Sequence, residues 1–274
     1  MIGAICGDVI GSVYEFNNIK TKEFEFFKSM HKGDCRYTDD SAMTIAIAKA
    51  CIEYVKDRKE SDENVSIEKF RDNCKNYMLE IGRKYPRSGF GGRFFLWLCS
   101  PDPKPYNSFG NGSAMRVSPC GWVANSLEEA EKLAEASADV THNHPEGIKG
   151  AKSIAGAIWL LRNGKSKEEV LKYIEDNYYH IDFTLDEIRP TYKFYETCQG
   201  SVPQAIEAFM ESTDFEDAIR NAISIGGDSD TIAAITGSLA EACYGIPKEI
   251  QEKAISYLED DMKEVVEEFK EMIN

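Results

Sequence analysis

Two short clusters of acidic and hydroxyl side chains lie far apart in the sequence, at Thr38-Asp39-Asp40 and at Asp228-Ser229-Asp230-Thr231. Each precedes an apolar, helix-like run, so a fold that joined the two runs would gather four carboxylates at one place. Four carboxylates repel one another strongly in a low-dielectric site unless they are protonated or neutralised by cations. Because oxygen ligands favour hard ions, the clusters predict a site for Mg²⁺, Mn²⁺ or Ca²⁺.

Helix capping is the simpler interpretation of either cluster alone, since Thr and Asp are favoured N-cap residues. One acidic residue is enough for a cap, however, and Gly226-Gly227 before the second cluster favours a tight turn and close approach of a ligand. Two clusters that each begin a buried helix therefore favour the metal site over capping.

Glu15 is a third candidate, because it follows a segment nearly free of charge, Gly7-Asp8-Val9-Ile10-Gly11. A glutamate among small apolar residues is costly unless it is paired or bound to a metal. A carboxylate at a helix end that reaches solvent is the alternative.

A glycine-rich loop, Ser108-Phe109-Gly110-Asn111-Gly112-Ser113, leads into an apolar run. Backbone N–H groups of such a loop can bind phosphate without lysines. The loop matches neither a Walker loop nor a dinucleotide fingerprint, so an ordinary turn is the alternative. Further along lies Thr141-His142-Asn143-His144-Pro145, with only His31 and His180 as other histidines. We therefore expect a histidine hydrogen bond to a phosphate or acidic ligand rather than structural zinc.

Helical signals dominate the elements that must position these residues. The C-terminal segment repeats apolar residues in steps of three and four from Ile250 to Ile273, which predicts an amphipathic helix. No sustained apolar–polar alternation occurs, so the sequence predicts an all-α fold. Four capping boxes are present, at Ser126 with Glu129, Ser166 with Glu169, Thr184 with Glu187, and Thr213 with Glu216.

Three segments, residues 2–13, 41–51 and 231–243, are rich in small apolar side chains. Helices that are apolar on nearly all sides belong in a protein interior. The first segment carries glycines at four-residue spacing, which lets helix axes approach closely. We therefore predict a central group of tightly packed helices, each beginning at an acidic cluster.

The chain has 274 residues, 42% of them hydrophobic, and a net charge of −15. This length suits one domain over residues 1–274, and the negative charge argues against a nucleic-acid-binding surface. No apolar run is long enough for a membrane span, and the N-terminus lacks the basic region of a signal peptide. Eight cysteines without a C-x-x-C pair, among them Cys6, Cys51 and Cys243, are interpreted as buried free thiols. We expect a monomer in the cytoplasm.

Taken in order, these motifs resemble the ADP-ribosylglycohydrolase family, which includes the dinitrogenase-reductase-activating glycohydrolases. Any one motif is weak, but the ordered set is specific and covers residues 3 to about 245. The matching segments are Gly7–Gly11 with Glu15, Tyr37–Met43, Gly110–Arg116, Thr141–Pro145 and Gly226–Thr231.

The resemblance implies an all-α orthogonal bundle with a centre of two Mg²⁺ or Mn²⁺ ions. Glu15 matches a position beside the scissile bond. Six side chains are implied as metal ligands, namely Thr38, Asp39, Asp40, Asp228, Asp230 and Thr231. The diphosphate and ribose are implied to contact Ser108, Gly110, Asn111, Gly112 and Ser113, with His142 near the same ligand.

The implied reaction is hydrolysis of the bond between ADP-ribose and an acceptor, either a protein side chain such as Arg or Ser, or a small molecule. Glu15, Asp39 and Asp230 are the candidate catalytic residues, and which carboxylate moves the proton stays open. Two alternatives remain, a different two-metal nucleotide hydrolase and a non-catalytic relative that binds ADP-ribose. The segment 84–106, with Arg93, Phe94, Phe95 and Trp97, either shapes the acceptor side or belongs to the core.

Overall fold

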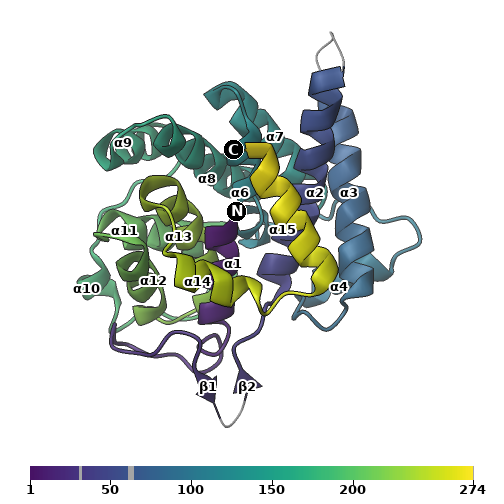
Figure 1. Cartoon of the computed structure of the whole chain (residues 1–274). Helices are drawn as coiled ribbons and strands as arrows, with labels where there is room; N and C mark the ends of the chain where they lie inside the picture. The colour runs from purple at the N-terminus through teal and green to yellow at the C-terminus, as the bar shows by residue number, and fades with distance from the viewer. Residues whose placement is uncertain (31–32, 61–64, 274) are drawn as a thin grey trace.

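The computed structural model describes residues 1–30, 33–60 and 65–273. Over these residues the protein is all-helical apart from one hairpin of two short antiparallel strands, β1 (Ser29–Met30) and β2 (Gly33–Asp34), which confirms the predicted fold class. The helices in Figure 1 are α1 (Ile2–Gly11), α2 (Asp39–Glu60), α3 (Ile67–Lys84), α4 (Gly92–Cys99), α5 (Gly112–Met115), α6 (Ser118–Val123), α7 (Leu127–Asp139), α8 (Pro145–Arg162), α9 (Lys167–Asn177), α10 (Leu185–Ile188), α11 (Cys198–Met210), α12 (Phe215–Ser224), α13 (Ser229–Tyr244), α14 (Lys248–Ile255) and α15 (Asp260–Ile273).

Helices α1 and α13 lie against each other in the middle of the molecule (Figure 1). A Cβ atom on Gly7 would lie 2.0 Å from the carbonyl oxygen of Ala233, and one on Gly3 would lie 2.0 Å from that of Gly237. No real side chain fits such a gap, so glycine alone permits this approach of the two backbones. The centre is tightly packed through small residues, as predicted. The expectation that each central helix begins at an acidic cluster is wrong for α1, which has no acidic residue in its first turn.

Helix α2 contacts both central helices and is covered on its other sides by α3, α6 and α15. Residues 40–48 of α2 are all buried, as are residues 229–240 of α13. The two acidic clusters therefore occupy the first turns of two interior helices, and the third interior helix, α1, lies beside both of them.

The capping predictions hold in part. Ser166 and Thr184 form complete capping boxes. At Ser126 only half of the box forms, because the Glu129 carboxylate accepts the N–H of Asn125 at 2.5 Å. The prediction at Thr213 is wrong by one residue, since Asp214 is the N-cap of α12 and its carboxylate accepts the N–H of Asp217.

The C-terminal stripe of apolar residues covers two helices, α14 and α15, instead of one. The hydroxyl of Ser256 donates to the carbonyl of Lys253 at 2.6 Å, a local bond that competes with continuation of the helix. Cys6 and Cys51 are buried free thiols as predicted, but Cys243 is exposed, and so is Cys99. None of the helices in the described residues has the length and apolar composition needed to cross a bilayer.

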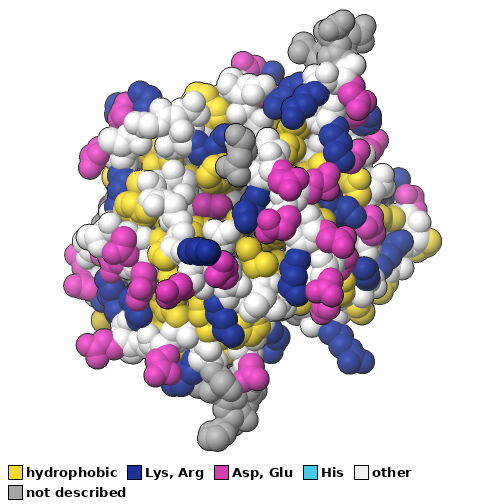
Figure 2. Space-filling model, in the orientation of Figure 1, with side chains coloured by type: hydrophobic (Ala, Val, Ile, Leu, Met, Phe, Trp, Pro, Cys, Tyr) yellow, Lys and Arg dark blue, Asp and Glu magenta, His cyan; other side chains and the backbone are white. Residues whose placement is uncertain are grey.

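Acidic and basic side chains alternate over the face shown in Figure 2, with apolar side chains between them. The negative net charge is therefore not gathered into one patch on this face. The denser concentration of carboxylates lies inside the molecule, where the three interior helices meet.

Candidate active site

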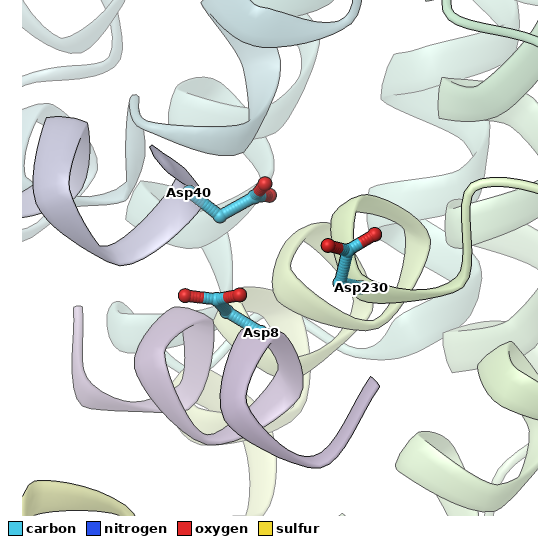
Figure 3. Close-up of side chains that lie close together, drawn as sticks. All are labelled: Asp8, Asp40 and Asp230. Atoms are coloured by element: carbon cyan, nitrogen blue, oxygen red, sulfur yellow. The ribbon is translucent and has the colours of Figure 1, made fainter. Parts of the chain in front are cut away.

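Three interior helices each contribute one carboxylate to a single point. Asp8 comes from α1, Asp40 from the first turn of α2 and Asp230 from the first turn of α13, and Figure 3 shows them around a common space. Oxygen atoms of the three side chains all lie within 4.8 Å of one another. A second group at the same spacing joins Asp230 to Glu15 and Asp228. Clusters far apart in the sequence are therefore adjacent in the fold.

Asp8 fixes the first turn of α2 in place. Its carboxylate accepts the backbone N–H of Thr38 at 2.9 Å and the hydroxyl of Thr38 at 2.6 Å. It also accepts the N–H of Ser41 at 3.0 Å and the Ser41 hydroxyl. Helix α1 thus positions the first acidic cluster through one buried carboxylate, while its glycines hold it against α13.

The oxygens that face this space are only partly satisfied by the protein. Thr231 donates its hydroxyl to one oxygen of Asp40 at 3.1 Å and its N–H to Asp230 at 3.0 Å. The other oxygen of Asp40 is buried without a hydrogen-bond partner among the described residues. A buried, unpaired carboxylate oxygen is costly unless a cation contacts it. Together with the surrounding oxygen donors, it fits a hard metal ion.

Burial raises the pKa of each carboxyl in the two groups of converging carboxylates. Removal from water raises the pKa values of Asp40 and Asp230 well above the usual range, and neighbouring carboxylates add to the effect. The pKa of Asp39 rises to about 8 for the same reasons. Burial and the charge of Asp228 raise the pKa of Glu15 to about 7. The site therefore disfavours its own ionisation unless positive charge is supplied.

A cavity of about 340 Å³ extends from these carboxylates toward the glycine-rich loop. We call its two parts the carboxylate end, lined by Glu15, Asp39, Asp40, Asp228, Asp230 and Thr231, and the loop end, lined by Tyr106, Phe109, Gly110, Asn111, Gly112, Arg116 and His142. Thr38 is buried behind the carboxylate end, where it bonds Asp8.

The glycine-rich loop is tied to the carboxylate end by Asn111. Its side-chain amide donates to Asp228 at 2.7 Å and to the hydroxyl of Ser201 at 3.1 Å. Two of the backbone N–H groups predicted to bind phosphate are already used, because Asn111 bonds the carbonyl of Glu196 and Gly110 bonds the Ser108 hydroxyl. The loop orients a carboxylate as well as lining the cavity.

Not every residue implied as a ligand contact reaches the cavity. Gly110, Asn111, Gly112 and His142 line it, whereas Ser108 and Ser113 do not. Ser113 is buried, and its hydroxyl donates to the carbonyl of Gly147 at 2.7 Å.

The aromatic segment 84–106 divides between the two roles left open for it. Arg93 and Phe94 line the cavity. Trp97 is buried in the core, and Phe95 is 42% exposed. Neither interpretation therefore holds for the whole segment.

Among the site residues that were not predicted are Asp8, Arg116 and Glu196. Asp8 carries the same signal as Glu15, a carboxylate within a small apolar run, and could have been found by it. Arg116 is a cation inside the same matched motif as the loop. Glu196 lines the cavity but lies in a segment without any motif, so only the fold reveals it.

Comparison with known proteins identifies a family that covers the whole chain. The sequence model of the ADP-ribosylglycohydrolase family matches residues 1–274. The human "ADP-ribosylhydrolase ARH3" is 27% identical, over 96% of this chain and 90% of that protein. The "ADP-ribosylarginine hydrolase Tri1" of Pseudomonas putida is 26% identical, over 90% of this chain and 70% of that protein.

Among solved structures, an "ADP-ribosylglycohydrolase-related protein complex" has the same fold. The TM-score is 0.69 at 21% identity, and the match covers 100% of this chain and 96% of the other. The helical fold, the convergent acidic clusters and the full-length family match agree, and the chain belongs to the ADP-ribosylglycohydrolase family.

Proposed function

We propose that this protein is a metal-dependent hydrolase that cleaves the glycosidic bond between ADP-ribose and an acceptor. The observation that carries the proposal is the convergence of Asp8, Asp40 and Asp230 from three helices, in a chain whose family is named for this activity. The alternative of an ordinary helix cap does not account for Asp40, because one of its oxygens is buried without a partner among the described residues.

The proposed cofactor is a pair of Mg²⁺ or Mn²⁺ ions. The side chains that converge on the space are carboxylates, and one buried carboxylate oxygen there has no partner among the described residues, so the residues present fit hard cations. When bound, such ions would supply positive charge and make a bound water more acidic. The proposed ligands are Thr38, Asp39, Asp40, Asp228, Asp230 and Thr231.

Glu15, Asp39 and Asp230 are the proposed catalytic carboxylates. Glu15 is half-buried at the edge of the acidic groups, so its carboxyl can exchange a proton with a reacting group and with solvent. Asp39 is half-buried like Glu15, and Asp230 is buried. At either position a carboxylate can stabilise the positive charge that develops on a ribose during glycosidic cleavage. Asn111 keeps Asp228 oriented toward the same space.

The loop end is proposed to hold the rest of ADP-ribose. Gly110 and Gly112 leave room for a ligand beside the imidazole of His142. Arg116 gives this end a positive charge that the carboxylate end lacks, which suits a diphosphate. The acceptor would leave through the mouth of the cavity, and the partner is an ADP-ribosylated protein or small molecule.

A hydrolysis panel tests the proposal. Substrates with ADP-ribose linked to arginine, to serine and to acetate are incubated with the protein in Mg²⁺ and in EDTA, and the products are identified by mass. We expect free ADP-ribose from at least one linkage, only with Mg²⁺. Release of phosphate or AMP would instead indicate another nucleotide hydrolase. Calorimetric binding of ADP-ribose without any turnover would indicate a non-catalytic relative.

A further inference from the structure

Arg116 is a buried cation at the loop end of the cavity. Its side chain is 1% exposed and forms no ion pair with the described residues. Instead its guanidinium donates to the carbonyl of Ser137, in the last turn of α7, and to the hydroxyl oxygen of Thr141, both at 3.0 Å. The partial negative charge at a helix C-terminus partly offsets the buried positive charge. Burial lowers the pKa of Arg116 to about 10, so the side chain stays charged at neutral pH.

The Thr141 hydroxyl that accepts from Arg116 also contacts His142. The hydroxyl oxygen of Thr141 lies 2.7 Å from Nδ1 of His142. A threonine hydroxyl has a single proton, and Thr141 is fully buried. Since Arg116 can only donate, it occupies a lone pair of Thr141, and Nδ1 is the sole acceptor for the Thr141 proton among the described residues. A proton on Nδ1 would leave that hydroxyl buried without an acceptor, at a cost of about 1–3 kcal/mol.

The other ring nitrogen of His142 faces the cavity. A Cβ atom on Gly112 would lie 3.1 Å from Nε2, and one on Gly110 would lie 3.4 Å from it, so Nε2 borders the space that the two glycines leave open. Burial holds the pKa of His142 well below its usual range, and the charges of Arg116 and Arg93 lower it further. A neutral imidazole carries one proton, and the nitrogen that holds it is set by the partner of the other nitrogen.

We propose that Arg116 and Thr141 are positioning residues that hold His142 as its Nε2–H tautomer, a neutral hydrogen-bond donor to an oxygen of the ligand at the loop end. The ligand oxygen belongs to a phosphate or to a ribose hydroxyl, and this part rests on the proposed function. The tautomer itself follows from the protein's own contacts. Such a donor keeps its proton through the neutral pH range, so its bond to the ligand does not depend on titration.

The first experiment determines the tautomer in the unaltered full chain. Nitrogen NMR of protein labelled at histidine distinguishes a protonated from an unprotonated ring nitrogen, and the spectrum of His142→Gln identifies the signals of His142. We expect an unprotonated Nδ1 and a protonated Nε2 at pH 7. A proton on Nδ1, or on both nitrogens, would overturn the proposal without any further variant.

The second experiment removes the hydrogen bond from Thr141 to His142 and then restores it. Thr141→Val deletes the hydroxyl at nearly constant volume, and we expect a mixture of tautomers in the spectrum. ADP-ribose binding measured by calorimetry should weaken in proportion to the lost Nε2–H fraction, about twofold to tenfold. Thr141→Ser keeps the hydroxyl and should restore both the spectrum and the affinity. A valine variant with the wild-type spectrum and affinity would overturn the proposal.

These readouts separate the inference from the proposed function. If the valine variant does not fold, the wild-type spectrum and the serine variant still decide the tautomer. An Nε2–H tautomer in a protein that neither binds ADP-ribose nor hydrolyses its conjugates would support the positioning role of Arg116 and Thr141 and contradict the proposed function. Hydrolysis by a protein with an Nδ1–H tautomer would support the proposed function and contradict the positioning role of Arg116 and Thr141.

Discussion

The interface between α1 and α13 and the acidic cluster beside it are built from the same two helices, yet they are opposite in physical character. Along the interface, Gly3 and Gly7 bring backbones so close that no Cβ atom fits. At the cluster, Asp8 and Asp230 of these helices meet Asp40, one of whose oxygens is buried without a partner among the described residues. Close packing stabilises the fold, whereas grouped buried carboxylates destabilise it until a cation is present.

The difference indicates what each region contributes. The interface holds the helices that carry Asp8 and Asp230 against each other, and Asp8 in turn bonds the first turn of α2, which carries Asp40. This packing keeps three like charges together in the cluster. If this view is right, substitutions in the two regions should have opposite effects on the metal-free protein.

Asp230→Asn should nearly abolish hydrolysis while stabilising the metal-free protein. The amide keeps an oxygen that can accept the Thr231 N–H, but it removes the charge of a residue that belongs to both groups of converging carboxylates. We expect kcat/KM to fall about a thousandfold, which corresponds to roughly 4 kcal/mol. Its melting temperature at pH 8 without divalent ions should rise, because repulsion is relieved.

The exposed Asp182→Asn is the matched control and should change neither quantity. Full Mg²⁺-dependent activity in Asp230→Asn would show that Asp230 is not a catalytic residue. A lower melting temperature in the metal-free variant would contradict the view that the cluster destabilises the fold.

Gly7→Ala should destabilise the metal-free protein, whereas Asp230→Asn stabilises it. The new methyl group would lie 2.0 Å from the carbonyl oxygen of Ala233, so the helices must separate. We expect a loss of about 3 kcal/mol in the free energy of unfolding, measured by urea denaturation with and without Mg²⁺. Gly92→Ala is the control, because a Cβ atom there meets nothing within 4 Å. Equal stability of the two variants would show that α1 and α13 can part without cost.

The close contact itself was foreseeable from glycines at four-residue spacing, and the all-α class from the helix caps and apolar periodicity. The break between α14 and α15 was not, because the apolar stripe continues across it while Ser256 ends the first helix through a local bond. The cap at Asp214 was missed for a similar reason, since Thr and Asp are adjacent and both are good caps.

The carboxylate end was predictable because its residues lie in motifs that precede helices. The loop end was less so. Asn111 was expected to contact ligand, but its amide is bound to Asp228 and Ser201, and such a pairing between distant segments leaves no trace in a single sequence. Arg116 and Thr141 belonged to the quoted motifs, yet their contact with each other depends on the packing of α7 against the loop.

Mg²⁺ should stabilise the protein more at high pH than at low pH. The pKa values of Glu15 and Asp39 rise from ordinary values of 4.5 and 3.8 to about 7 and about 8 in the folded chain. Their contribution to stability is therefore fully present below about pH 4 and is lost as the pH rises through 7 and 8. Bound Mg²⁺ replaces the lost protons, so the increase in melting temperature should grow from pH 5.5 to pH 8.5.

At a hundredfold excess of Mg²⁺ over its dissociation constant, the expected gain is about 2.7 kcal/mol. Sodium chloride at equal ionic strength is the control for simple screening. An increase that is equal at both pH values, or that persists in Asp230→Asn, would place the ion elsewhere.

Glu207 offers the smallest and most selective test, because it is a carboxyl with a raised pKa outside the cluster. Burial, together with the nearby Glu211, raises its pKa to about 7 on the half-buried side of α11. By the same sign argument, its contribution to stability is present below about pH 4.5 and is lost as the pH rises through 7. Glu207→Gln should therefore stabilise the protein by only ~0.5 kcal/mol at pH 8.5 and not at all at pH 4.5, because solvent screens the charge.

Mg²⁺ should stabilise Glu207→Gln as much as the wild type, since Glu207 belongs to neither group of converging carboxylates found in the described residues. A raised pKa alone then destabilises the fold slightly, and only carboxylates that three helices hold within 4.8 Å of one another respond to the ion. If Glu207→Gln lowered the Mg²⁺-dependent stabilisation, convergence of helices would not be what distinguishes the cluster from other buried acids.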